Sequence, residues 1–130
     1  MLYLFVIGRI LLGGFFLLNG YNHMKNMKMM AGYAGSKGVP MPTLAVFVTG
    51  LMLLLGGAGI LLGVYVRVAI LLLSIFLVGV SFKMHDYWNL EDPMQKMVQE
   101  INFKKNMAIL GALLMISLIP LSTWAMLALF

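Results

Sequence analysis

The side chains best suited to chemistry in this 130-residue chain lie in three short polar groups. Two of the groups share the spacing i, i+3, i+4, which places their members on one face of a helix. The groups are Asn19, Asn22 and His23; the pair His85 and Asp86; and Asn102, Lys105 and Asn106. Imidazole and carboxamide groups can hydrogen-bond the carbonyl oxygens of a small molecule, and imidazole can also exchange a proton near neutral pH.

Long apolar segments separate these groups, and they indicate a membrane protein. The chain is 62% hydrophobic and 10% charged, with a mean hydropathy of +1.00, whereas an ordinary soluble domain is about 25% charged. About 20 apolar residues suffice to cross the hydrocarbon core of a bilayer. We therefore predict an all-α integral membrane four-helix bundle, a single domain over residues 1–130, with helices at about 2–22, 43–65, 67–84 and 103–121. The first helix is expected to be retained, because no basic n-region or cleavage pattern marks it as a signal peptide.

The basic residues predict which side of the membrane each loop occupies. With four helices, the loops at 23–42 and 85–102 share one side, and all seven lysines lie on that side. The two arginines, Arg9 and Arg67, lie on the other. Since basic residues favour the cytoplasmic side, we expect both loops in the cytoplasm and both termini outside, in a bacterial-type cytoplasmic (inner) membrane. The net charge of +5 then reflects topology and attraction to anionic lipid, with no nucleic-acid partner.

Both of these loops carry signals for short amphipathic interfacial helices. In the first loop, Met24, Met27 and Ala31 recur at helical spacing before a stretch rich in glycine and proline. In the second loop, Asp92 is a predicted N-cap, followed by Pro93 at the first helical position, and an apolar stripe begins after it. This second amphipathic stretch is placed so that it can continue into the fourth helix.

Arg9 is the charge placed deepest in an apolar segment, and such a charge is a candidate functional residue. No acidic residue occurs in any apolar segment to pair with it. Its alternative role is structural, because its long side chain can reach helix-end carbonyls, lipid phosphate or interfacial water.

Small residues recur at four-residue spacing, as in Gly59 and Gly63. Such spacing lets helix backbones approach closely inside a membrane. It fits packing within the bundle and a homo-oligomer interface equally well.

The three polar groups are expected at one depth, at the cytoplasmic ends of three helices, and they admit two interpretations. In the structural interpretation they form a hydrogen-bonded cluster that joins the bundle, since buried amides need partners. In the functional interpretation they line a pocket for a quinone or a similar ring, with Tyr87 or Trp88 stacking on it. The alternative role of Trp88 is that of an aromatic residue at the membrane interface.

Other site chemistries find little support in the sequence. The chain has no cysteine, P-loop, dinucleotide fingerprint or set of nucleophile and base, so no intrinsic cofactor is expected. Thirteen methionines raise copper handling as a minor alternative, but Met27 and Met29 would point to different sides of a helix. Two histidines and Asp86 are too few to specify a site for a harder metal ion. We therefore predict no metal site.

The order of short motifs along the chain resembles that of the DoxX family of small four-helix membrane proteins. These motifs are Gly8-Arg9-Ile10-Leu11-Leu12-Gly13, Asn19-Gly20, the stretch at 32–42, the glycine pair at 56–57, His85-Asp86-Tyr87-Trp88 and Asn102-Phe103-Lys104-Lys105-Asn106. The resemblance extends over roughly residues 5–122 and implies a four-helix membrane fold. It implies no shared catalytic motif.

The resemblance implies a role beside a redox or detoxification enzyme, since family members resemble the small subunit of a thiosulfate:quinone oxidoreductase. The expected function is that of an accessory or structural inner-membrane subunit, and we expect the chain not to be catalytic alone. The alternative is a quinone-binding subunit of a membrane oxidoreductase whose partner supplies the redox centre.

Overall fold

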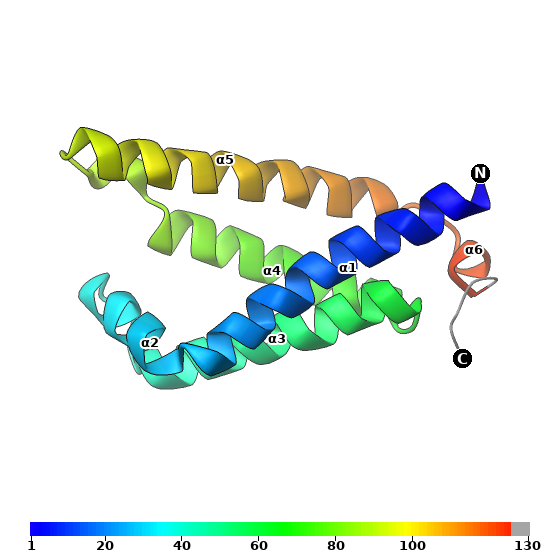
Figure 1. Cartoon of the computed structure of the whole chain (residues 1–130), viewed down its shortest axis with the longest axis horizontal. Coiled ribbons are helices and arrows are strands. Elements are labelled where there is room, and N and C mark those ends of the chain that lie inside the picture. The colour runs from blue at the N-terminus through cyan, green and yellow to red at the C-terminus, as the bar shows by residue number, and fades with distance from the viewer. Residues whose placement is uncertain (126–130) are drawn as a thin grey trace.

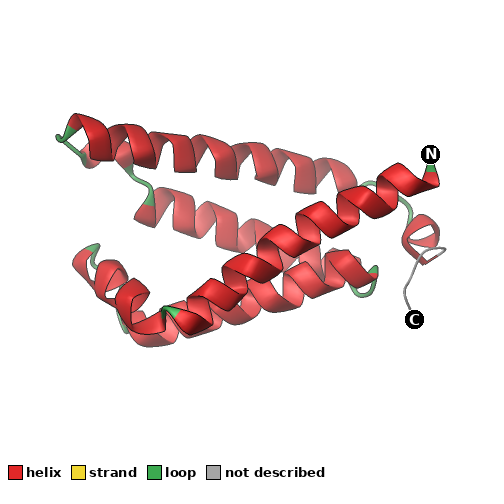
Figure 2. Ribbon diagram, in the orientation of Figure 1, coloured by secondary structure: helices red, strands yellow, loops and turns green. Residues whose placement is uncertain are grey.

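The computed structural model describes residues 1–125, and within that range it is helical, with short loops and no strand (Figures 1 and 2). The final residues of the predicted domain, 126–130, lie outside the described range. The elements in chain order are α1 (Leu2–Lys25), α2 (Met27–Ser36), α3 (Pro42–Leu62), α4 (Val66–Met84), the 3₁₀ helix η1 (Tyr87–Asn89), α5 (Pro93–Ile116) and α6 (Leu121–Ala125).

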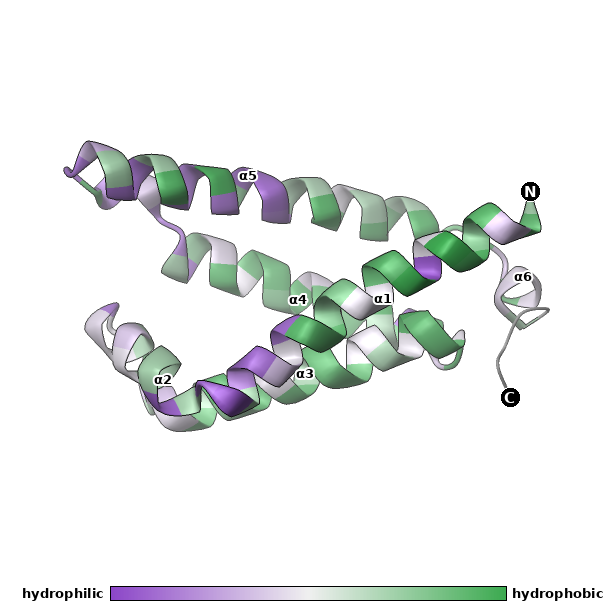
Figure 3. Ribbon diagram, viewed as in Figure 1, coloured by the Kyte–Doolittle hydropathy of each residue, from purple (hydrophilic) through white to green (hydrophobic). Residues whose placement is uncertain are grey.

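Three of the long helices have the length and apolar composition needed to cross a membrane. These candidate spans are Leu2–Lys25, Pro42–Leu62 and Val66–Asn89. The fourth long helix, α5, has as many residues as α1, 24 each, but polar residues gather in the half that follows η1 (Figure 3). An all-helical fold over residues 1–125 with three helices able to cross a membrane confirms the predicted all-α membrane bundle, although α5 is not among the candidate spans.

The helices pack in a row, α1 against α3, α3 against α4 and α4 against α5. Within residues 1–125, no comparable packing joins α1 to α5, and Figure 1 shows these two helices diverging away from the N-terminus. The α1–α3 contact is close because both helices present glycine. A Cβ added to Gly13 would lie 2.8 Å from the carbonyl oxygen of Gly57. This contact between small residues therefore joins two helices of the same chain.

The buried core follows the same row of helices. Apolar side chains from α1, α3, α4 and α5 meet along its length, and those with at most 1% exposure are Phe16, Leu53, Ile60, Leu73, Leu77 and Leu113. A second, smaller cluster lies where α2 packs on α3 and comprises Ala31, Ala34 and Val46. The first loop therefore contains the predicted helix, and that helix is packed against the bundle.

The predicted fourth helix, at about 103–121, is wrong at both ends. The amphipathic stretch of the second loop is continuous with it, so α5 begins at Pro93. Asp92 determines this start, because its carboxylate accepts a hydrogen bond from the backbone N–H of Gln95 at 3.0 Å. The helix ends at Ile116 because Pro120 cannot donate to the carbonyl four residues earlier, and it disfavours the helical conformation just before it.

The other predicted boundaries differ by smaller amounts. Helix α1 runs to Lys25 beyond the predicted end at 22, and α3 ends at Leu62 before the predicted end at 65. Gly63 ends α3 in the left-handed conformation, with φ of 75°. Helix α4 agrees closely with the prediction of 67–84.

Candidate functional site

A cavity of about 760 Å³ lies between α1, α3, α4 and α5, with α2 lining one end of it. It lies where α1 and α5 lack close packing. Much of its wall is apolar and includes Phe15, Phe16, Met30, Leu53 and Phe76. Apolar walls with a few polar groups are the usual composition of sites for small organic ligands.

The cavity brings together most of the predicted site residues. Six of the ten candidates line it, and they come from α1, from the residue after α4 and from α5. They are Asn19, His23, His85, Asn102, Lys105 and Asn106. Residues at three distant places in the sequence therefore line one cavity.

The α1 side of the cavity holds a local hydrogen-bond chain. Asn19 donates from Nδ2 to the carbonyl oxygen of Phe15 at 2.7 Å, and its own backbone carbonyl oxygen lies 3.0 Å from Nδ1 of His23. A carbonyl oxygen only accepts, so Nδ1 of His23 carries the proton. In the neutral ring, Nε2 is then an acceptor. The His23 side chain is 9% exposed and meets the ring of Phe76 edge-on at 5.8 Å between centroids.

The α4 and α5 side offers a second imidazole and a buried amide. Nδ1 of His85 lies 2.6 Å from Oε1 of Gln99, and with this carbonyl as acceptor Nδ1 again carries the proton. Asn106 is 6% exposed, and within residues 1–125 its side chain has no hydrogen-bond partner. Asn106 is not among the described residues whose polar side-chain atoms are both fully buried and without a partner, which are Ser74 and Ser81, so its amide stays accessible from the cavity and is free to bind a ligand.

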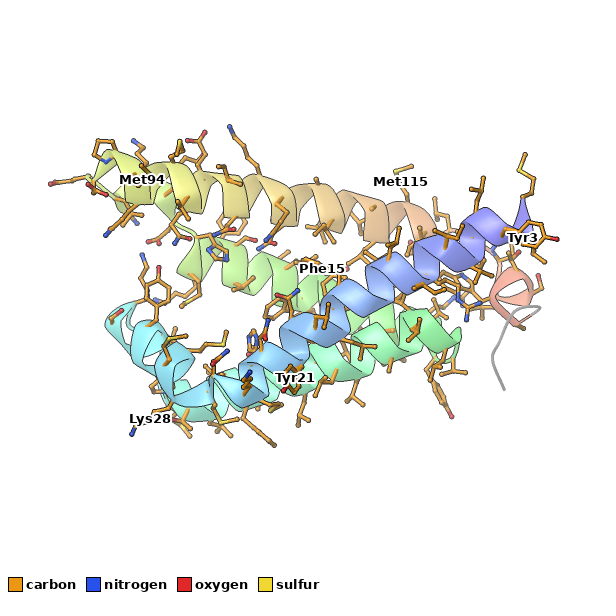
Figure 4. The ribbon with its side chains drawn as sticks, viewed as in Figure 1. Tyr3, Phe15, Tyr21, Lys28, Met94 and Met115 are labelled. Atoms are coloured by element: carbon orange, nitrogen blue, oxygen red, sulfur yellow. The ribbon has the colours of Figure 1, made fainter. Side chains whose placement is uncertain are left out.

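Two lysines complete the polar end of the cavity. Nζ of Lys105 lies 5.8 Å from the centre of the Phe15 ring, so the ammonium of α5 reaches across to α1. In Figure 4, Phe15 lies on the stretch of α1 that faces α5. Lys83 lines the cavity from α4. The polar end therefore combines hydrogen-bonding groups with positive charge.

Arg9 lies apart from this cavity, at the far end of α3. Its guanidinium donates to the carbonyl oxygens of Ile60, at 3.2 Å, and Leu61, at 2.8 Å, and it lies 5.8 Å from the Phe5 and Trp124 ring centres. These carbonyls belong to the last turn of α3, where no next turn supplies N–H groups. The side chain is 4% exposed, and its contacts agree with the structural interpretation.

Three further candidates also lie outside the cavity lining. The Asn22 side chain is exposed on the surface of α1. Asp86 forms an ion pair with Lys37 at 2.5 Å and accepts a hydrogen bond from Asn89 at 3.0 Å. Trp88 packs at the edge of an aromatic cluster, with ring centroids 5.5 Å from Phe103. Within residues 1–125, no group of three or more His, Asp or Glu side chains is arranged to hold a metal ion.

Several lining residues escaped the sequence analysis. Phe15 lies four residues before Asn19, and Lys83 lies two residues before His85, so helical spacing from the predicted polar residues could have found Phe15. Tyr33 and Met30 belong to α2, whose position over the end of the cavity depends on tertiary packing. No local signal in the sequence could have placed them.

Comparison with known proteins agrees with this architecture. Residues 4–86, more than half of the chain, match the DoxX family model. The chain is also 30% identical over 115 residues to the inner membrane protein YphA of Escherichia coli (strain K12), an alignment that covers 88% of this chain and 81% of that protein. No solved structure matches the chain. The resemblance carried by the sequence motifs is confirmed, and the chain belongs to the DoxX family.

Proposed function

We propose that the chain is an accessory subunit of a membrane oxidoreductase and that it binds a quinone-type molecule in the cavity. The observation that carries the proposal is Asn106, a buried carboxamide that lines the cavity without a hydrogen-bond partner in residues 1–125. The amide atoms of Asn106 are accessible from the cavity, since they are not among the fully buried side-chain atoms without a partner in the described residues. A ligand carbonyl that accepts a hydrogen bond from Nδ2 of Asn106 gains about 0.5–1.5 kcal/mol.

The shape and chemistry of the cavity suit a quinone for two further reasons. Phe15 and Phe76 provide aromatic surface beside the polar groups, so a planar ring packs against them while its carbonyls reach the amide. His23 and His85 each donate from Nδ1 within the chain, so Nε2 of each neutral ring can accept a hydrogen bond from the hydroxyl of the reduced, hydroquinone form, although it cannot donate to a quinone carbonyl. The sequence contains no nucleotide-binding fingerprint or cysteine, so we assign the redox centre to a partner protein.

The site's position in the membrane follows from the lysine distribution. With the loops at 23–42 and 85–102 in the cytoplasm of a bacterial cell, the polar end of the cavity faces the cytoplasmic leaflet of the inner membrane. A soluble or membrane oxidoreductase partner would then dock on the same side, where α2 and η1 project.

A purely structural accessory subunit is the second candidate. It is favoured by the hydrogen bonds that Asn19, His23 and His85 already make within the chain, because groups satisfied internally need no ligand. In that case the cavity is filled by lipid acyl chains, and the polar groups only join the helices.

Titration of the purified protein with a short-chain ubiquinone analogue separates the two candidates. Trp88 lies three residues after His85, which lines the cavity, and its fluorescence provides the signal. We expect saturable quenching in the wild type and about tenfold weaker binding in Asn106→Leu, the loss of one buried hydrogen bond. Asn22→Leu is the matched control, since Asn22 is exposed outside the cavity. Equal affinities of the two variants refute the quinone site.

Loss of binding in Asn106→Leu is informative only if the variant folds. Its thermal unfolding is therefore measured beside that of Asn22→Leu. A conservative variant, Asn106→Gln, keeps the carboxamide and should retain part of the affinity. A His85→Ala variant tests the second polar contact independently.

A further inference from the structure

The lining of the cavity contains no carboxylate among residues 1–125, although it contains two lysines. The four acidic residues of the chain all lie outside the lining of the cavity. Asp86 pairs with Lys37, and Glu100 pairs with Lys104 on the outer surface of α5 at 2.7 Å. Glu91 and Asp92 are exposed at the start of α5. The polar end of the cavity therefore has a positive charge that no neighbouring acid of the chain neutralises.

The two lysines are directed to this place by contacts on opposite sides of the cavity. The Lys105 ammonium lies over the Phe15 ring of the facing helix. The Lys83 ammonium lies 3.7 Å from where a Cβ on Gly38 would lie, so it extends toward the loop between α2 and α3. Within residues 1–125, neither lysine forms an ion pair. Both side chains are exposed and line the cavity, so they border its open part, where the head of a bound ligand would lie.

Hydrogen-bond donors lie beside this positive charge. Asn106 and Asn102 line the cavity from the same face of α5 as Lys105, and each carboxamide has two N–H donors. An oxygen that bears negative charge accepts hydrogen bonds roughly twice as strong as those of a neutral carbonyl. The same groups that receive a quinone carbonyl therefore bind an ionised oxygen more strongly.

We propose that the ligand of this cavity has an ionised oxygen on its polar head, next to an apolar ring or chain. The proposal rests on the quinone site proposed above and narrows its ligand class. Among quinones, the ionised form of a hydroxyquinone fits this description. A long-chain carboxylate has the same head chemistry, and the experiment distinguishes the two sources.

The test compares two naphthoquinones that differ in charge and share one ring. 2-Hydroxy-1,4-naphthoquinone is anionic at pH 7, and 2-methoxy-1,4-naphthoquinone is neutral. In a nonionic detergent we expect the wild type to bind the anion about tenfold more tightly, in line with a charge-assisted hydrogen bond near an ammonium. In Lys83→Gln/Lys105→Gln the ratio should fall to about twofold. Partitioning into detergent affects every variant equally, so it cancels in the comparison.

Lys104→Gln is the matched control, because Lys104 adjoins Lys105 but pairs with Glu100 outside the cavity. It should keep the tenfold ratio. If the anion and the methyl ether bind equally to the wild type, the charge inference is overturned while the quinone site stands. If the ratio falls equally in Lys104→Gln, a general surface charge explains it, and the inference is overturned as well.

A second pair of probes, myristate and its neutral ester methyl myristate, tests whether the ligand is a long-chain carboxylate. If myristate binds with the same lysine dependence and neither naphthoquinone binds, the ionised head is supported and the quinone ring is refuted. If none of the four probes binds, the proposed quinone site itself fails. The failure of the inference and the failure of the proposed function are therefore distinguishable.

Discussion

Replacing Gly13 by alanine tests whether backbone contact holds α1 against α3. A Cβ at this position would lie 2.8 Å from the carbonyl oxygen of Gly57 and 2.9 Å from the backbone nitrogen of Leu61. Both atoms belong to the backbone of a helix, so they cannot turn aside as the end of a side chain can. The two helices must separate, and overpacking of this kind costs about 1–3 kcal/mol. Alanine recovers about 0.5–1 kcal/mol over glycine within a helix, which leaves a net loss of up to about 2.5 kcal/mol.

Gly14 is the matched control, because it is the next residue of α1 and an added Cβ there meets nothing within 4 Å. Gly14→Ala should stabilise the protein by about 0.5–1 kcal/mol through helix propensity alone. Titration with SDS in mixed micelles gives both free energies of unfolding. Trp124, which is 2% exposed, reports the loss of packing once Trp88 is replaced by Phe. Equal free energies of unfolding for the two alanine variants would refute the close α1–α3 contact.

Three further predictions concern other parts of the chain. Asp92→Ala should destabilise the start of α5 by about 1 kcal/mol, seen as faster amide hydrogen exchange in its first turn, whereas Glu91→Ala leaves exchange unchanged. Arg9→Gln should lower the free energy of unfolding by about 1.5–3 kcal/mol, because charged donors to the α3 carbonyls are lost; an unchanged SDS midpoint would contradict this. The chain has no cysteine of its own, so single-cysteine variants test the orientation. Lys28→Cys should react with an impermeant maleimide only from the cytoplasmic side, and Arg67→Cys only from the outside. The reverse pattern would overturn the proposed orientation.

The membrane bundle could be predicted because hydropathy alone determines where a bilayer helix is placed. Helix α4 illustrates this, since Arg67 and Lys83 bracket an uninterrupted apolar run and the helix extends from Val66 to Met84. The start of α5 could not be predicted in the same way. There the N-cap at Asp92 extends the helix well before the apolar run begins, so local capping and hydropathy gave different boundaries.

The polar cluster could be predicted because its members share helical faces, yet spacing did not say which of them reach the cavity. Asn19 and Asn22 share a predicted face, but only Asn19 lines the cavity. The rotation of α1 about its own axis determines which of the two side chains faces the cavity. Close packing of Gly13 and Gly20 against α3 fixes this rotation, since a Cβ at Gly20 would lie 2.8 Å from Cγ of Leu54. The cavity itself depends on the lack of extensive packing between α1 and α5 within residues 1–125, a tertiary property without a local sequence signal.

The row-like packing of the bundle has a consequence for how a ligand exchanges. At the end of the cavity beside α2, the Lys37–Asp86 ion pair and the hydrogen bond from Tyr33 Oη to the Met84 carbonyl oxygen connect α2 to the end of α4. Along the side, α1 and α5 have no extended contact within residues 1–125. We therefore expect a ligand to enter and leave the cavity between α1 and α5 by diffusing laterally within the leaflet, rather than by passing through water. Exchange rates should then depend on the mole fraction of ligand in the lipid and on the thickness of the surrounding bilayer.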